Sequence, residues 1–233
     1  VRGARAAAIN TKCQVHQRTC LLALLGYTNE HRGYFPILGE LRLENAFDTV
    51  YYGRLDYYTQ RSMWHIAVRD ALGPTGIEPV QACAADPQYQ RSTIGDTRAQ
   101  APPDSTLPTA FWLTHAAISD PAAWLPGGNP DDERMLRGVR IDAVAFPSAK
   151  TLLSETNPRH LGITTIPGGA QRSTYSLLDN PPAPAKYNLA MADASIRSVH
   201  TDNIVPGFVG PTGRRYVPTI GTPGGIRGRD VRD

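Results

Sequence analysis

The sequence has no long apolar segment and no strong surplus of charge of either sign. None of its 233 residues lies in a run that approaches the roughly eighteen consecutive apolar residues needed to span a bilayer. An initiator methionine and a signal peptide are also lacking, so we expect a soluble chain that has been processed or truncated. The 24 Lys and Arg residues against 21 Asp and Glu residues leave a net charge of +3. Because the basic residues are dispersed except near the two ends, we expect no nucleic-acid binding.

Local signatures of catalysis are missing as well. The chain has no P-loop, no dinucleotide-binding glycine motif, no nucleophile elbow and no zinc-protease helix. None of the six histidines lies three or four residues from another, so no helical metal pair is present. Glu155 and Asp193 stand near predicted strand ends and would suit an acidic pair for Ca²⁺ or catalysis. A turn role for Asp193 and an ion pair for Glu155 explain them more simply, and we expect no enzyme.

The first 33 residues show helical periodicity. Apolar or semi-apolar side chains recur at steps of three and four and so share one helical face. They stand at Ile9, Cys13, His16, Cys20, Ala23 or Leu24, and Tyr27. Gly33 and Pro36 mark a stop. The pattern predicts a stem helix over 1–33, with His16 as a packed histidine. The helix begins without a cap, which suggests that an upstream segment has been removed.

Shorter elements follow the stem. A helix is predicted over 61–72 with Ser62 as its N-cap, and another over 130–137 capped by Asn129. Strands are predicted at 139–144, 150–155, 188–191 and 195–199, the last two as a hairpin.

This order of elements predicts an α+β fold, in which a long N-terminal helix packs on an antiparallel β-sheet with long irregular loops. We divide the chain into the stem helix 1–33, a globular domain 34–200 and a Pro/Gly-rich C-terminal arm 201–233. The arm contains Phe208 and Tyr216, so we expect it to lie on a neighbouring molecule.

Five separated segments carry a further pattern in a fixed order. They are Ala4-Arg5-Ala6-Ala7-Ala8 with Lys12-Cys13, Ala23-Leu24 with the stretch from Tyr27 to Gly33-Tyr34-Phe35-Pro36, Cys83-Ala84-Ala85-Asp86-Pro87, Phe146-Pro147-Ser148-Ala149-Lys150-Thr151-Leu152-Leu153-Ser154-Glu155, and Tyr187-Asn188-Leu189-Ala190-Met191-Ala192-Asp193-Ala194-Ser195-Ile196-Arg197. Together they resemble the prepilin-type pseudopilins abundant in planctomycetes and verrucomicrobia. The resemblance implies a pilin-like domain on a helical stem, related to subunits of type IV pili and type II secretion systems.

Three departures from that family matter. Its cleavage motif and hydrophobic N-terminal half-helix are absent, and Ala183 stands where the family often has a histidine. Ala194 replaces the glycine of the hairpin. A type I′ turn needs positive φ at both central residues, which alanine resists, so we expect a longer turn or one of another type.

The resemblance implies a structural, self-assembling subunit of an envelope or extracellular filament. Its partners would be copies of itself or other pilin-like subunits, with membrane contact only through the missing N-terminal segment and no cofactor. The alternative is a minor pseudopilin or a surface binding module with an aromatic recognition face. Interface candidates for either role are Tyr51, Tyr52, Tyr57, Tyr58, Phe208 and Tyr216; core packing would explain some of the tyrosines equally well.

Two further site hypotheses stay open. Asp131, Asp132 and Glu133 offer oxygen ligands for Ca²⁺, which some secretion pseudopilins bind, although helix capping explains the same residues. Cys13 and Cys20 lie about two helical turns apart and so cannot bond to each other. In an extracytoplasmic location either could pair with Cys83, and three buried thiols is the alternative.

Overall fold

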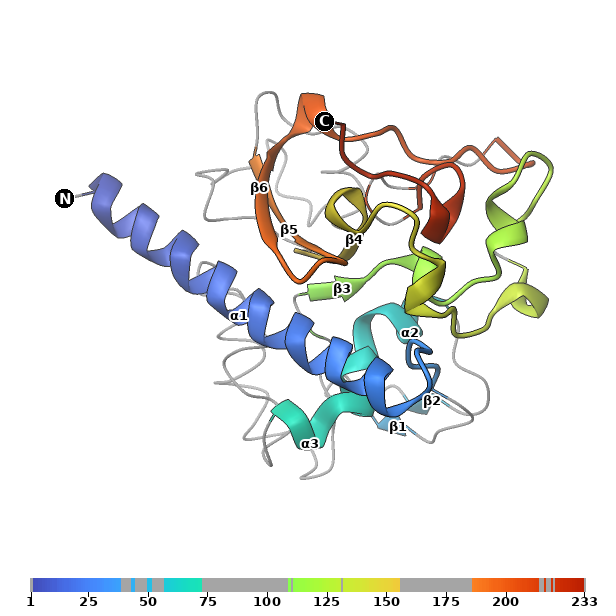
Figure 1. Ribbon diagram of the computed structural model, residues 1–233, viewed down its shortest axis with the longest axis horizontal. Helices are drawn as coiled ribbons and strands as arrows, with labels where there is room; N and C mark the ends of the chain where they lie inside the picture. Colours follow the sequence, from blue (N-terminus) through green and yellow to red (C-terminus); the bar gives the residue numbers. More distant parts are fainter. Residues whose placement is uncertain are drawn as a thin grey trace.

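A single long helix crosses a four-stranded antiparallel sheet in the computed structural model of this chain (Figure 1). The helix, α1, spans Arg2–Glu30. The residues that the structure describes are 2–38, 43–44, 50–51, 57–72, 109, 111–130, 132–155, 186–213, 216, 219 and 221–232. The predicted α+β class is therefore confirmed, and the stem helix ends three residues before its predicted limit.

The sheet has the order β3-β4-β5-β6, and every neighbouring pair is antiparallel. Its strands are β3 (Phe111–Leu113), β4 (Thr151–Glu155), β5 (Lys186–Met191) and β6 (Ile196–His200). Every residue of β4 is buried, as expected for an inner strand with both faces covered. A separate two-stranded ribbon pairs β1 (Leu43–Glu44) with β2 (Val50–Tyr51). The predicted strand at 150–155 and the late hairpin are confirmed.

The hairpin turn differs from type I′, as the alanine predicted. Ala194 alone among its residues has positive φ, at 66°. The amide of Ala194 donates to Met191 O at 3.1 Å, and Asp193 Oδ1 accepts hydrogen bonds from the amide and hydroxyl of Ser195. This is a three-residue loop in which a β-turn is followed by one left-handed residue. Asp193 thus has the turn role that the sequence favoured.

The helix predicted over 61–72 begins earlier. Residues 57–72 form three consecutive helical pieces, α2 (Tyr57–Met63), a 3₁₀ stretch (Trp64–Val68) and α3 (Arg69–Leu72). Ser62 is not a cap, because it lies inside α2, is buried and accepts a hydrogen bond at its carbonyl from Thr109. The last of these pieces ends at Leu72, as predicted.

Two predictions for residues 129–144 are wrong. The helix expected over 130–137 is a single 3₁₀ turn, Glu133–Met135, and its cap is Asp132 rather than Asn129. It stops there because the amides that follow are taken by other segments: Arg137 N donates to Ile118 O at 3.0 Å.

The strand expected over 139–144 shrinks to an isolated bridge between Arg140 and Tyr34. Ile141 N donates to Gly33 O at 2.7 Å, and a 3₁₀ turn over Ile141–Ala143 follows at once. The alternating pattern therefore marks a short extended segment that leaves its partner after one residue pair.

The C-terminal segment is not an arm that leaves the domain. Phe208 and Tyr216 are each only 6% exposed and pack around Trp124, with ring centroids 5.7 and 5.3 Å from the indole. The expected role of both residues in contacts with a neighbour is thus replaced by packing inside this chain. A Cβ on Gly221 or Gly225 would lie 2.3 Å from Trp124, so these glycines permit the close approach.

A buried ion pair fixes the same segment to β4. Lys150 Nζ lies 2.9 Å from Asp230 Oδ1, and both side chains are fully buried. Lys150 also donates to Gly225 O, and the second Asp230 oxygen accepts from Thr151 N at 2.8 Å.

In the described part of the chain, the helices are too short or too polar to cross a bilayer.

Candidate functional site: the exposed face of helix α1

Helix α1 packs on the sheet with the face that its periodicity predicts. Cys13, His16, Cys20 and Leu24 are buried on this face, and Ile9 and Tyr27 are partly buried. The contact reaches β4, β5 and β6. Burial of this stripe is the main apolar contribution that holds the helix on the domain.

A polar seam that the sequence did not predict runs along the same contact. Gln17 is fully buried, and its Nε2 donates to the carbonyl oxygens of Leu153 in β4 (3.0 Å) and Asn188 in β5 (3.1 Å). The side chain of Asn188 accepts from Gln14 Nε2 at 3.0 Å and donates to Asn10 Oδ1 at 2.7 Å. These bonds fix the register of the helix on the sheet, since each needs a particular partner.

Glu155 lies next to this seam at the end of β4 and is 2% exposed. Burial raises the pKa of its carboxyl to about 8, and a hydrogen bond from Asn188 acts in the opposite direction. Glu155 pairs with Phe111 at one end of β4, whereas Asp193 follows Met191, which pairs with Thr151 at the other end. The two acids therefore do not form a joint site.

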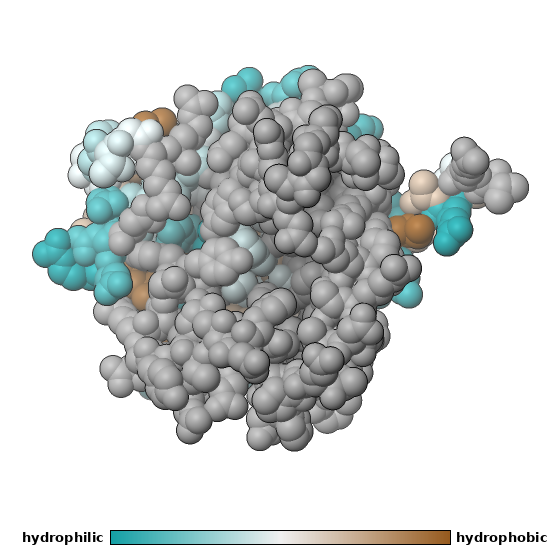
Figure 2. Space-filling model, turned by 180° about the vertical axis from the view of Figure 1, so that it is seen from behind, coloured by the Kyte–Doolittle hydropathy of each residue, from teal (hydrophilic) through white to brown (hydrophobic). Residues whose placement is uncertain are grey.

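The opposite face of α1 is exposed. Its first turns, residues 3–8, are exposed all round, and this end projects from the body in both views (Figures 1 and 2). Further along, Val15 and Leu22 are 57% and 51% exposed. We call the following set the outer stripe of α1: Ala4, Ala8, Thr11, Val15, Arg18 and Leu22.

The outer stripe has the spacing of a helix-packing seam. Its members follow one another at alternating steps of four and three, which keeps them on one side of a helix that supercoils with another. The Thr11 hydroxyl donates to Ala7 O at 3.0 Å, so its polar group is already bonded within the helix. The heptad step from Ala8 to Val15 to Leu22 was the sequence signal that could have identified this face.

Most of the predicted aromatic candidates lie where side chains are not described. Tyr51 belongs to β2, Tyr57 and Tyr58 begin α2, and Tyr52 lies outside the described residues. Trp64, which follows them, is a core residue whose Nε1 donates to Phe111 O at 2.8 Å. The aromatic recognition face stays a prediction.

The acidic cluster is engaged in local structure. Asp132 forms an ion pair with Arg134 at 2.6 Å and caps the 3₁₀ turn that follows. Hydrogen bonds from the Arg134 side chain and amide lower the pKa of Asp132 to about 2. Glu133 is exposed, and Asp131 lies outside the described residues. Within the described ranges no three His, Cys, Asp or Glu residues gather as metal ligands would, and calcium stays a prediction.

The cysteines of α1 differ. Cys13 is disulfide-bonded, whereas burial raises the pKa of the Cys20 thiol to about 12. Cys83 lies outside the described residues. The arrangement favours Cys13 over Cys20 as the partner in the predicted bridge.

Comparison with protein-family models, with curated proteins and with solved structures gives no match to this chain. The likeness to pseudopilins therefore depends on the five sequence segments and on the helix-and-sheet architecture.

Proposed function

We propose that this chain is a structural, pilin-like subunit that assembles with copies of itself in an envelope or extracellular filament. The observation that carries the proposal is the division of α1 into a face packed on its own sheet and an outer stripe left exposed. A helix used in this way joins a globular domain to neighbouring helices.

The chemistry of the outer stripe fits a helix as its occupant. Ala4 and Ala8 are small enough to let a second helix approach closely, while Val15 and Leu22 supply apolar area that is lost from water on contact. Arg18 interrupts the apolar series and would restrict the register of the pair. Repeated contacts between different surfaces of successive copies produce a filament when the rotation between copies does not close a ring.

The test is a charge placed on the outer stripe. Leu22→Glu should strongly reduce the polymers seen by electron microscopy and by sedimentation of the purified chain, because the contact would desolvate a carboxylate and pairing with Arg18 one turn away offsets this cost only in part. Leu125→Glu is the matched control: Leu125 is 55% exposed but lies outside α1.

Polymers that survive Leu22→Glu, or that Leu125→Glu disrupts equally, would exclude the outer stripe as the assembly surface. A wild-type chain that stays monomeric at every accessible concentration would exclude self-assembly itself.

A further inference from the structure

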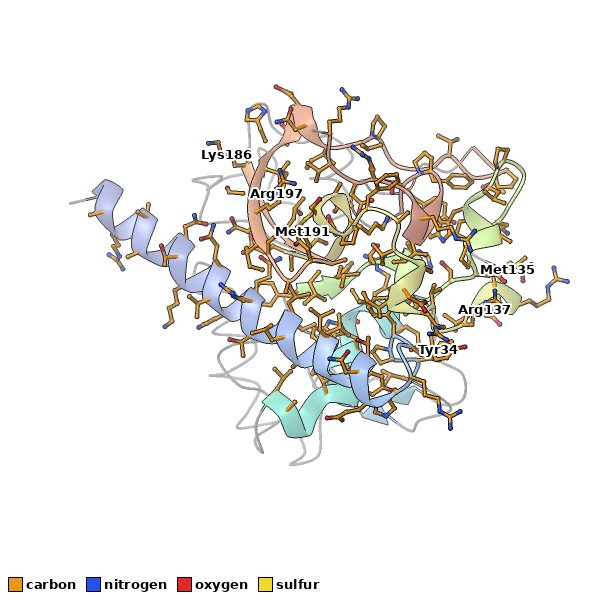
Figure 3. The ribbon with its side chains drawn as sticks, in the orientation of Figure 1. Tyr34, Met135, Arg137, Lys186, Met191 and Arg197 are labelled. Atoms are coloured by element: carbon orange, nitrogen blue, oxygen red, sulfur yellow. The ribbon has the colours of Figure 1, made fainter. Side chains whose placement is uncertain are left out.

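A cavity on the side of the domain away from the β5–β6 hairpin is lined by three arginines. It has a volume of about 640 Å³, within the usual range for small-molecule sites. Tyr34 comes from the segment after α1, Arg137 and Arg140 from the chain after the 3₁₀ turn at 133–135, and Arg227 from the last 3₁₀ turn. Tyr34 and Arg137 lie near one another on one side of the molecule (Figure 3).

Backbone hydrogen bonds hold the cavity walls in place. Tyr34 and Arg140 form an isolated β-bridge, and Phe35 N donates to Val139 O at 2.9 Å. Gly138 has no room for a side chain, because a Cβ there would lie 2.5 Å from Phe35 O. The arginines thus start from a fixed frame, which reduces the entropy lost on binding.

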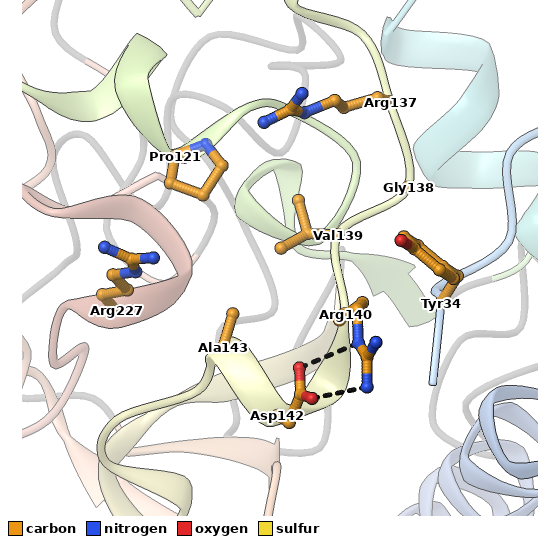
Figure 4. A pocket seen from close by; sticks show the side chains of 9 residues that line it. All are labelled: Tyr34, Pro121, Arg137, Gly138, Val139, Arg140, Asp142, Ala143 and Arg227. Carbon is orange, nitrogen blue, oxygen red and sulfur yellow. Dashed lines mark hydrogen bonds and ion pairs between the residues drawn. The ribbon is translucent and has the colours of Figure 1, made fainter. Parts of the chain in front are cut away.

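The charges around the cavity do not cancel. Arg140 makes a bidentate pair with Asp142, with nitrogen–oxygen distances of 2.6 and 3.1 Å (Figure 4). Arg137 pairs with Asp120 at 2.7 Å. Arg227 has no acidic partner among the described residues, and Figure 4 shows it across the cavity from Arg140 and Tyr34. Three guanidinium groups against two carboxylates leave one unmatched positive charge.

The other residues that line the cavity indicate which groups a ligand would carry besides a negative charge for Arg227. Asp142 presents acceptor oxygens beside Arg140, and its carboxylate would repel a second negative charge on a ligand. Tyr34 is 46% exposed, and the Arg140 guanidinium lies 5.8 Å from its ring centroid. A ligand with one negative charge and several hydroxyl donors satisfies both the unmatched arginine and the acceptor oxygens.

From this geometry we propose that the cavity is a binding site for a uronic-acid residue of an acidic oligosaccharide, with its carboxylate on Arg227 and its hydroxyls toward Asp142. A neutral sugar would leave Arg227 unused, and a phosphate dianion would face Asp142. The proposal is independent of filament assembly, since none of these residues belongs to α1.

The test measures binding of the methyl glycoside of galacturonic acid, a sugar with a single carboxylate, to the whole 233-residue chain by isothermal titration calorimetry at low salt. The methyl ester of the same glycoside, which has nearly the same shape without the charge, should bind about tenfold more weakly, as expected for the loss of an exposed charge-assisted pair. Arg227→Gln should weaken binding of the acid by the same factor and make the acid and the ester bind equally. Arg232→Gln, at another exposed arginine of the same segment, should change neither.

Three results would overturn the proposal. The first is an absence of binding by the galacturonic acid glycoside, and the second is an ester that binds as tightly as the acid. The third is inorganic sulfate that displaces the glycoside at equal concentration, which would show that the cavity recognises an anion and not a sugar. If Arg232→Gln weakened binding as much as Arg227→Gln does, the sugar would be attracted by the overall charge of the segment. That result would likewise exclude the cavity as the binding site.

Discussion

The C-terminal segment 221–232 and the first turns of α1 differ in how they are held by the rest of the chain. The first is irregular and rich in glycine, yet Lys150 and Asp230 anchor it with side chains that are 0% exposed. The second is a regular helix, yet residues 3–8 are all exposed. A segment can therefore have regular secondary structure without tertiary contacts, and an irregular segment can be firmly anchored by them. Alanine-rich turns can extend a helix that is already formed through their propensity, without tertiary contacts of their own, whereas an irregular segment needs particular long-range partners.

The largest test of this contrast removes the anchor of the C-terminal segment. Asp230→Ala leaves the buried Lys150 ammonium without its carboxylate, and we expect the free energy of unfolding to fall by about 3–5 kcal/mol. Chemical denaturation of the dilute chain measures the change. Lys150→Met in the same chain should recover part of the loss, because it removes the unpaired charge.

Asp202→Ala is the control for that experiment. Asp202 pairs with His200, but its side chain is 81% exposed, so we expect little change. If Asp230→Ala were as mild as Asp202→Ala, the C-terminal segment would not be fixed by this pair, and the contrast between the two ends would fail.

The contact beneath α1 should weaken as the pH rises. Burial raises the pKa of Glu155 from 4.5 in the unfolded chain to about 8 in the fold. The folded state therefore favours the protonated acid; its contribution to stability is complete below about pH 4.5 and is lost as the pH rises through about 8. Since one pKa unit corresponds to about 1.4 kcal/mol, Glu155→Gln should be more stable than the parent by a few kcal/mol at pH 9.

Denaturation of both proteins at pH 4 and pH 9 isolates this effect, because the other titrating groups are shared. Nearly equal stability at pH 4 and a clear advantage for Glu155→Gln at pH 9 is the expected result. Parallel dependence on pH would mean that the Glu155 carboxyl is not desolvated by the helix-and-sheet contact.

The packed half of α1 should depend on its polar seam. Gln17→Met keeps the length of the side chain but leaves the carbonyl oxygens of Leu153 and Asn188 without the amide donor. We expect a loss of about 1–3 kcal/mol. Arg18→Met, one residue away on the outer stripe, should change stability by less than about 0.5 kcal/mol. Equal effects in thermal denaturation would show that the two faces of the helix are not distinct.

The periodic elements could be predicted from the sequence because each needs only a partner of a general kind, such as an apolar surface. The stripe that includes Cys13 and Leu24 needs only an apolar surface, so its spacing predicted the buried face of α1. The hairpin was found in the same way. Gln17 lies on that face but is polar, and nothing local indicates the two carbonyl groups that accept its hydrogen bonds.

The role of the C-terminal segment was predicted wrongly because glycine occurs both in irregular projecting segments and where two groups pack closely. The Pro/Gly-rich composition suggested an arm that lies on a neighbouring molecule, whereas in the fold Gly221 and Gly225 admit the ring of Trp124. That contact joins residues about 100 positions apart, and the Lys150–Asp230 pair is also non-local. The arginine cavity was missed for the same reason, since Tyr34 and Arg227 meet only through the fold.

The smallest effects come from one chemical change made in two places. Ala194→Gly should stabilise the chain by up to about 1 kcal/mol, because it relieves the positive φ of 66° in the hairpin turn.

Ala6→Gly lies in the exposed turns of α1. A glycine within a helix costs about 1 kcal/mol, but turns without tertiary contacts open locally and contribute little to global unfolding. We therefore expect lower helicity by circular dichroism with an almost unchanged unfolding midpoint. A full loss of about 1 kcal/mol in global stability would show that the first turns of α1 unfold together with the domain, and the two ends of the chain would then be fixed alike.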